Sequence, residues 1–81
     1  MTTSTIFEQV RAMAADLFGV PAAQITAESS PETVAGWDSV QHLNLVLQLE
    51  QHFNVSFEPE EMDRMKTIGA VVELVASKLA A

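Results

Sequence analysis

The segment from Asp38 to Phe53 contains no glycine or proline, and its apolar residues recur at the spacing of an α-helix. At about 100° per residue they fall into two separate stripes. One stripe holds Leu45, Val46, Leu49 and Phe53, and the other holds Val40, Leu43 and Leu47, with Ser39 and Glu50 in the gap between them. A surface helix of a small bundle needs only one such stripe. Either this helix is buried on two sides, or one stripe is a contact patch for a partner or cargo.

Two further helices are predicted from caps and breakers. Ile6–Phe18 keeps helical apolar spacing, with Thr5 as the expected N-cap in a capping box with Glu8. Gly19 follows as a left-handed stop. Pro59 is the kind of residue that opens a helix, so a short helical piece is expected over Pro59–Met65.

The last helix and the loop complete the expected architecture. Thr67 can cap a final helix whose apolar stripe consists of Ile68, Val71, Val72, Val75 and Leu79. Asn54 can end the helix before it in the left-handed conformation. Gly19–Trp37 is a long loop with Val20 and Ile25 as its expected core anchors, and loops of this length are often functional. The prediction is an all-α fold: a small four-helix bundle with three main helices, a short third helix and a long loop after the first.

Composition limits the chain to a few kinds of protein. With 81 residues, we expect a single domain over residues 1–81. There is no cysteine, which excludes disulfides and thiolate metal sites, and His42 and His52 are too few for a convincing zinc site. The N-terminal residues lack the pattern of a signal peptide, and no apolar run approaches the roughly 18 residues of a membrane span. We therefore expect a soluble, cytoplasmic monomer without metal.

The charge pattern favours a basic partner. The net charge is −7, and no lysine or arginine occurs between Ala12 and Asp63. Such a surface repels nucleic acid and anionic lipid, and it suits electrostatic steering towards a basic protein surface. The same charge also keeps a small protein soluble, so composition alone leaves both explanations open.

The stretch Gly36-Trp37-Asp38-Ser39-Val40 resembles the modification site of the acyl carrier protein family, with Val40 in place of the usual leucine. The run from Leu45 to Phe53 and the acidic segment from Glu58 to Glu61 look like the helix and segment that follow in that family. The resemblance implies that Ser39 receives 4′-phosphopantetheine from coenzyme A, with Asp38 supporting that step by helping to hold Mg²⁺. Without the resemblance, Ser39 and Asp38 are a helix-start serine and an N-cap.

The resemblance also implies partners. The chain would be a carrier without enzymatic activity of its own, modified by a phosphopantetheinyl transferase and visited by acyl-transferring and acyl-modifying enzymes with basic docking patches. The positions that match the family's partner-facing residues are Val40, Leu43, Leu47, Glu50, Glu60, Glu61 and Asp63. Docking through such charges is fast and transient, as a shuttle requires.

Other positions depart from the family or remain open. Gln41, Asn44 and Gln51 stand where carriers of bulk fatty acid synthesis often have acids, which favours a specialised pathway. Trp37 is unusual and either packs over the loop or touches the arm or a partner. The methionines Met13, Met62 and Met65 either line a cargo site or fill gaps in the core.

Three functions are left to distinguish. The acidic balance and the aspartate before Ser39 favour a carrier of acyl groups in fatty acid, polyketide or related biosynthesis. An aminoacyl or peptidyl carrier of nonribosomal assembly is the alternative within the family. An unmodified helical adaptor that binds partners through the exposed stripe is the alternative outside it, and for an adaptor Ser39 is dispensable.

Overall fold

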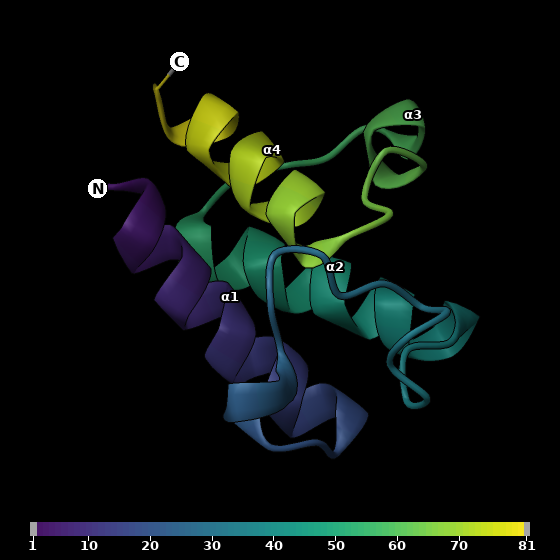
Figure 1. The fold of residues 1–81 in the computed structure, drawn as a ribbon. Helices are drawn as coiled ribbons and strands as arrows, with labels where there is room; N and C mark the ends of the chain where they lie inside the picture. The colour runs from purple at the N-terminus through teal and green to yellow at the C-terminus, as the bar shows by residue number, and fades with distance from the viewer. Residues whose placement is uncertain (1, 81) are drawn as a thin grey trace.

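The computed structural model describes residues 2–80, and all its regular elements over that range are helical. In chain order they are α1 (Thr3–Phe18), the 3-10 turn η1 (Ala22–Gln24), α2 (Ser39–Phe53), α3 (Pro59–Met62) and α4 (Ile68–Ala80). Helices α1, α2 and α4 surround a shared interior, and the short α3 lies in the connection between α2 and α4 (Figure 1). The predicted all-α bundle is confirmed. Over the described residues, none of the helices combines the length and apolarity that a membrane crossing requires.

Helix α1 begins earlier than predicted. The hydroxyl of Thr2 accepts the N–H of Thr5 at 3.2 Å, so Thr2 is the N-cap and the predicted box of Thr5 and Glu8 is wrong. Glu8 instead pairs with Arg11 at 2.7 Å. Residue type could not select the cap, because four hydroxyl residues follow one another at this end of the chain. The other end is as predicted, since Gly19 takes the left-handed conformation with φ 69°.

Both ends of α2 agree with the prediction. Asp38 Oδ1 accepts the N–H of Gln41 at 2.9 Å, which makes Asp38 the N-cap. Asn54 ends the helix in the left-handed conformation with φ 56°. These two caps fix where α2 starts and therefore where Ser39 lies.

Helix α3 is shorter than predicted, ending at Met62 and not at Met65. Past Met62 the chain tightens, and the N–H of Met65 bonds to the carbonyl of Met62 three residues back. This turn brings the side chain of Met65 into the core, where it is 2% exposed. At the start of α3, the carboxylate of Glu61 accepts the N–H of Glu58 at 2.7 Å.

Helix α4 confirms its predicted cap but not the whole of its predicted stripe. The hydroxyl of Thr67 accepts the N–H of Ala70 at 3.1 Å. The buried residues of α4 are Ile68, Val71, Val72, Leu74 and Val75. Leu79 was predicted to join this stripe and is 39% exposed, because the last turn of α4 extends past the side chains that cover the rest of the helix. Leu74 packs into the core in addition.

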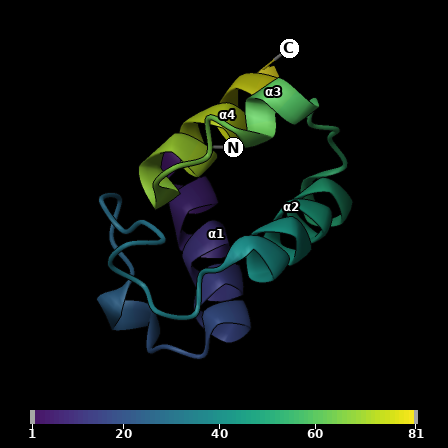
Figure 2. The same ribbon diagram turned by 90° about the vertical axis from the view of Figure 1, so that its right-hand side faces the viewer.

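The long loop is tied to the start of α4. The N–H groups of Ile68 and Gly69 donate to the carbonyl oxygens of Ser29 and Ala27, at 3.0 and 2.8 Å. Ile25 is buried as predicted. Figures 1 and 2 show the loop running from the end of α1 to the start of α4 and back to the start of α2. Because these bonds hold the middle of the loop in place, they also restrict the path of the loop residues that lead into α2.

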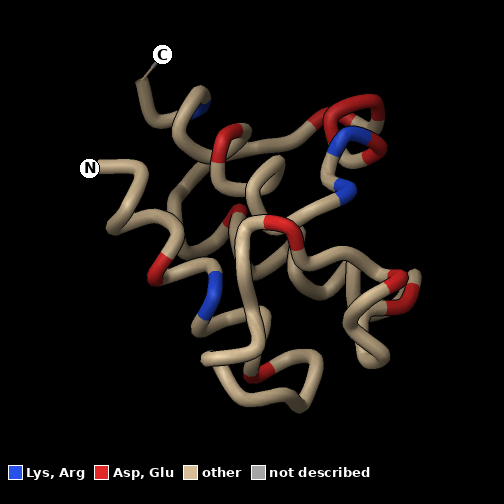
Figure 3. The backbone as a smooth tube through the Cα atoms, in the orientation of Figure 1, with Lys and Arg blue, Asp and Glu red and all other residues tan. Residues whose placement is uncertain are grey.

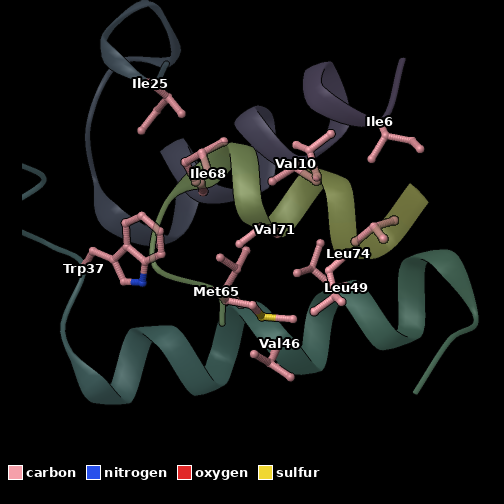
Figure 4. Close-up of a cluster of buried hydrophobic side chains, with 14 of the residues drawn as sticks. Ile6, Val10, Ile25, Trp37, Val46, Leu49, Met65, Ile68, Val71 and Leu74 are labelled. Carbon is pink, nitrogen blue, oxygen red and sulfur yellow. The ribbon is translucent and has the colours of Figure 1, made fainter. Parts of the chain in front are cut away.

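The core is one cluster shared by the three long helices and the loop. Figure 4 shows its members Ile6 and Val10 from α1, Val46 and Leu49 from α2, Val71 and Leu74 from α4, and Ile25 and Trp37 from the loop. All of them are buried. Helix α2 contributes only its first stripe to this cluster, so the interpretation in which α2 is buried on two sides is wrong.

Candidate functional site

Ser39 is the first residue of α2, and its side chain is exposed. Within residues 2–80, no hydrogen bond involves its hydroxyl, nor the backbone N–H groups of Ser39 and Val40. The Asp38 cap satisfies the N–H of Gln41 and leaves those two N–H groups open at the positive end of the helix dipole. The result is a free hydroxyl beside N–H groups that favour an anion.

Trp37 holds in place the backbone that leads into Ser39. Its indole is 2% exposed and stacks on Phe18, the last residue of α1, with ring centroids 5.2 Å apart. Its Nε1–H donates to His42 Nδ1 at 3.0 Å, and the two rings lie nearly parallel, with centroids 6.1 Å apart. Gly36 allows the close approach, because a Cβ there would overlap the backbone carbonyl oxygen of Phe18. The expectation that Trp37 packs over the loop is therefore correct, whereas its bond to His42 was missed.

A pocket of about 820 Å³ opens beside Ser39. It lies between the start of α2, with Ser39, His42 and Leu43, and the segment that contains Met62 and Met65. Two of the three expected methionines thus line one cavity. The third, Met13, borders a different surface hollow with Ala12 and Gln48 and packs against the core, so for Met13 the structure favours the gap-filling alternative over a shared cargo lining.

Comparison with known proteins decides the family. Residues 8–75 match the family model described as "Phosphopantetheine attachment site". The acyl carrier protein of Exiguobacterium sp. is 33% identical over 79 residues, which cover 98% of this chain and 100% of the relative. The chain belongs to the acyl carrier protein family.

Two further comparisons agree. The acyl carrier protein of Thermosynechococcus vestitus is 32% identical over 81 residues, covering 100% of both chains. The solution structure of holo acyl carrier protein from Geobacter metallireducens matches with a TM-score of 0.82 at 30% identity, over 91% of this chain and 85% of that one. An acyl carrier protein is a carrier and not an enzyme, and the group that this family holds is 4′-phosphopantetheine.

The residues of this acyl carrier protein fit such a group. Its attachment requires an accessible hydroxyl and an environment that accepts a phosphodiester anion. The exposed Ser39 hydroxyl and the free N–H groups of Ser39 and Val40 meet both needs. Among the residues from 2 to 80, no group of three or more potential metal-ligating side chains is found.

The apolar residues predicted to face partners lie on the outside of the carrier. Val40, Leu43 and Leu47 are 67%, 56% and 55% exposed, while the first stripe of the same helix is buried. Exposing three large aliphatic side chains on one helix face is unfavourable in water unless another surface covers them. Their contact with partner enzymes stays a prediction.

The predicted acidic residues divide into two kinds. Glu60 and Asp63 are exposed at α3, where Figure 3 shows acidic residues gathered next to the basic residues that follow. Glu50 is half-buried, and its Oε2 accepts the N–H of Phe57 at 2.9 Å. Glu61 bonds to Lys78 of α4 at 2.8 Å. Glu50 and Glu61 therefore have structural contacts that the sequence did not reveal, and any role of theirs in docking would be a second one.

Glu61 makes the stability of the carrier depend on pH. The N–H of Glu58 and then the ammonium group of Lys78 stabilise its carboxylate and hold its pKa below the ordinary value of 4.5. A carboxyl whose pKa is lowered by folding stabilises the protein above the unfolded pKa, and that contribution is lost as the pH falls through the folded pKa.

We therefore expect Glu61→Gln to lower the free energy of unfolding at about pH 7 and to lower it less at about pH 3, because the contribution of the Glu61 carboxylate declines as the pH falls below the unfolded pKa towards the folded one. Denaturant unfolding of both proteins at the two pH values measures this. Glu60→Gln is the matched control, because Glu60 is exposed, and it should match the parent at both pH values. An equal loss of unfolding free energy in Glu61→Gln at the two pH values would contradict the conclusion that the charge of Glu61 stabilises the fold.

Proposed function

We propose that Ser39 is the attachment point of 4′-phosphopantetheine and that the chain carries acyl intermediates as thioesters between biosynthetic enzymes. The observation that supports this most directly is the exposed Ser39 hydroxyl beside the free N–H groups at the start of α2. The chain has no cysteine, so the arm supplies the thiol on which an acyl group can be held.

In the proposed attachment, the Ser39 oxygen attacks the phosphorus of coenzyme A that bears the pantetheine. A Ser39 O–P bond forms, the pyrophosphate P–O bond breaks, and adenosine 3′,5′-bisphosphate leaves. The hydroxyl proton of Ser39 passes to a base of the transferase. The N–H groups of Ser39 and Val40 face the phosphodiester that remains and stabilise its charge.

The proposal is tested by intact mass. The purified chain is incubated with coenzyme A, Mg²⁺ and a broad-specificity phosphopantetheinyl transferase. One added 4′-phosphopantetheine group is expected. No increase in mass, under conditions that modify a control carrier completely, would contradict the proposal and leave an unmodified adaptor as the better explanation.

Asp38 has two roles in this proposal, and two variants separate them. Asp38 caps α2 through its side-chain oxygen, and in the transferase complex its charge helps to hold Mg²⁺. Asparagine is as good an N-cap as aspartate, so Asp38→Asn should keep the stability and slow the attachment, whereas Asp38→Ala should also lose about 1 kcal/mol of stability. Unfolding curves and the initial rate of attachment measure the two effects. Equal attachment rates for Asp38→Asn and the parent would show that the charge of Asp38 has no part in the attachment of 4′-phosphopantetheine.

We further propose that the cargo is acyl and that the pathway is a specialised one. The polar face of α2 bears Gln41 and Asn44, which are hydrogen-bonded to each other at 3.1 Å and carry no charge. Partners of this carrier would therefore contact uncharged hydrogen-bonding groups on that face, with the acids of α3 steering their approach. A chain loaded by aminoacyl-activating enzymes and refused by acyl-activating ones would favour the nonribosomal alternative.

A further inference from the structure

Trp37 and His42 form a rigid pair beside Ser39. The indole is stacked on Phe18, with ring centroids 5.2 Å apart and planes at 17°, and it is nearly parallel to the ring of His42, with centroids 6.1 Å apart and planes at 15°. Its Nε1–H donates to His42 Nδ1 at 3.0 Å. Trp37 is 2% exposed, stacked on Phe18 and bonded through its N–H edge to His42, so the packing around it holds it in place beside His42.

The hydrogen bond determines which nitrogen of His42 carries the proton. An indole N–H can only donate, so Nδ1 must be unprotonated, and the proton of the neutral ring is on Nε2. Within residues 2–80, Nε2 has no hydrogen-bond partner. No buried side-chain nitrogen or oxygen of the described chain lacks a partner, so this Nε2–H reaches solvent. His42 therefore presents a free donor.

His42 lies on the same side of α2 as Ser39. His42 follows Ser39 by three residues in α2, and residues at this spacing share a helix face with Cβ atoms about 5–6 Å apart. Both residues line the pocket described above. The charged residues that line the same pocket are Glu32, Asp38, Asp63 and Lys66. An anion attached to Ser39 would meet three carboxylates and a single ammonium group in this pocket, so an uncharged N–H donor beside it would offset part of the net repulsion.

We propose that His42 is a positioning residue for the arm: its Nε2–H donates to the phosphodiester attached to Ser39, and Trp37 fixes the tautomer that makes this possible. The inference rests on the proposed attachment at Ser39. It differs from a purely structural role of the pair, in which the Trp37 bond only fastens the loop to α2 and Nε2 stays in water.

The first test uses the unmodified chain. The ¹⁵N signals of the His42 ring, recorded at about pH 8 where imidazoles are ordinarily neutral, should show Nδ1 unprotonated and Nε2 protonated. In Trp37→Phe, which keeps an aromatic ring but has no N–H, the Nδ1 signal should move as its donor is lost. A protonated Nδ1 in the parent chain, or an unchanged Nδ1 signal in Trp37→Phe, would overturn the inference.

The second test compares the chain before and after attachment of the arm. The Nε2–H signals of His42 should shift on attachment. Those of His52 should not, because His52 lies at the far end of α2 and bonds to Gln9 of α1. His42→Asn keeps an acceptor for Trp37 but has no distal donor, and it should change the ³¹P signal of the modified chain. His52→Asn is the matched control and should leave the ³¹P signal as in the parent.

The outcomes separate the two proposals. An increase in mass with unchanged His42 signals, or with the same ³¹P signal in His42→Asn and the parent, overturns the role of His42 and leaves the attachment intact. No increase in mass overturns both. Loss of the Trp37 fluorescence change on unfolding would identify a histidine variant that fails to fold, and far-UV circular dichroism does so for Trp37→Phe, which has no tryptophan. If His42→Asn fails to fold, His42→Gln, which keeps a donor near the Nε2 position, should give the parent ³¹P signal. A changed ³¹P signal in folded His42→Gln would overturn the role of His42.

Discussion

Ser39→Ala is expected to abolish attachment of 4′-phosphopantetheine completely while the fold and stability are retained. The side chain of Ser39 is exposed and its hydroxyl has no hydrogen bond within residues 2–80, so removing the oxygen breaks no contact. Alanine is also a better helix former than serine. The attacking oxygen is lost, whereas the Asp38 cap remains. Intact mass after incubation with coenzyme A and a transferase measures the attachment, and unfolding curves measure the stability.

Ser56→Ala is the matched control. Ser56 is exposed in the α2–α3 connection, and its replacement should leave the attachment complete. Any increase in mass in Ser39→Ala would contradict the account, because another hydroxyl would then be the acceptor. A Ser39→Ala chain that was unfolded would also contradict it, because the structure gives the Ser39 side chain no part in holding the fold.

Gly36→Ala should have the largest effect on stability. The added Cβ would overlap the carbonyl oxygen of Phe18 and would lie 3.0 Å from its carbonyl carbon and Cα, all of them backbone atoms that cannot rotate aside. The end of α1 or the segment before α2 has to move, which also disturbs the stacking of Trp37 on Phe18. Overpacking of this kind costs about 1–3 kcal/mol or more, a large share of the stability of so small a bundle.

Trp37 is the only tryptophan in the sequence, so its fluorescence follows unfolding from inside the affected region. Gly19→Ala separates steric overlap from backbone strain: a Cβ at Gly19 meets no atom within 4 Å, but φ there is 69°. That variant should lose about 1–2 kcal/mol from the left-handed conformation alone. A Gly36→Ala chain as stable as the parent would show that the contact with Phe18 is looser than described.

Local signals in the sequence predicted the ends of α2 and the division of its faces. Asp38 and Asn54 are residues whose side chains or backbone preferences act within one turn, so their roles could be inferred without knowing the fold. Periodicity likewise separated the stripe of Val40, Leu43 and Leu47 from the other apolar residues, but it left open whether that stripe is buried, and the structure shows that it is exposed. These signals place Ser39 at the start of the helix, whereas its selection as a modification site depended on the resemblance of Gly36–Val40 to the family motif.

Interactions between distant segments could not be predicted. Glu50 bonds to the backbone of Phe57 only because the α2–α3 connection folds back over the helix, and Glu61 meets Lys78 only because α3 lies next to α4. Leu79 has the right period for the core, but the last turn of α4 extends past it. In each of these cases the tertiary arrangement decided the outcome, and the residue's own neighbours in sequence did not.

The Trp37–His42 bond is an intermediate case. The two residues are five apart, but they contact each other only because the loop packs Trp37 against Phe18 at the end of α1. A sequence signal existed, namely an aromatic N–H donor just before the helix and an imidazole in its first turns. Its meaning depended on the path of the loop.

The central claim is that the arm is attached to the oxygen of Ser39, and peptide mapping of the modified chain tests it most directly. Cleavage after glutamate releases residues 33–50, in which Ser39 is the only serine and Thr33 the only threonine. Fragmentation of this peptide should assign one 4′-phosphopantetheine group to Ser39. The group on Thr33, or on any peptide outside residues 33–50, would contradict the account.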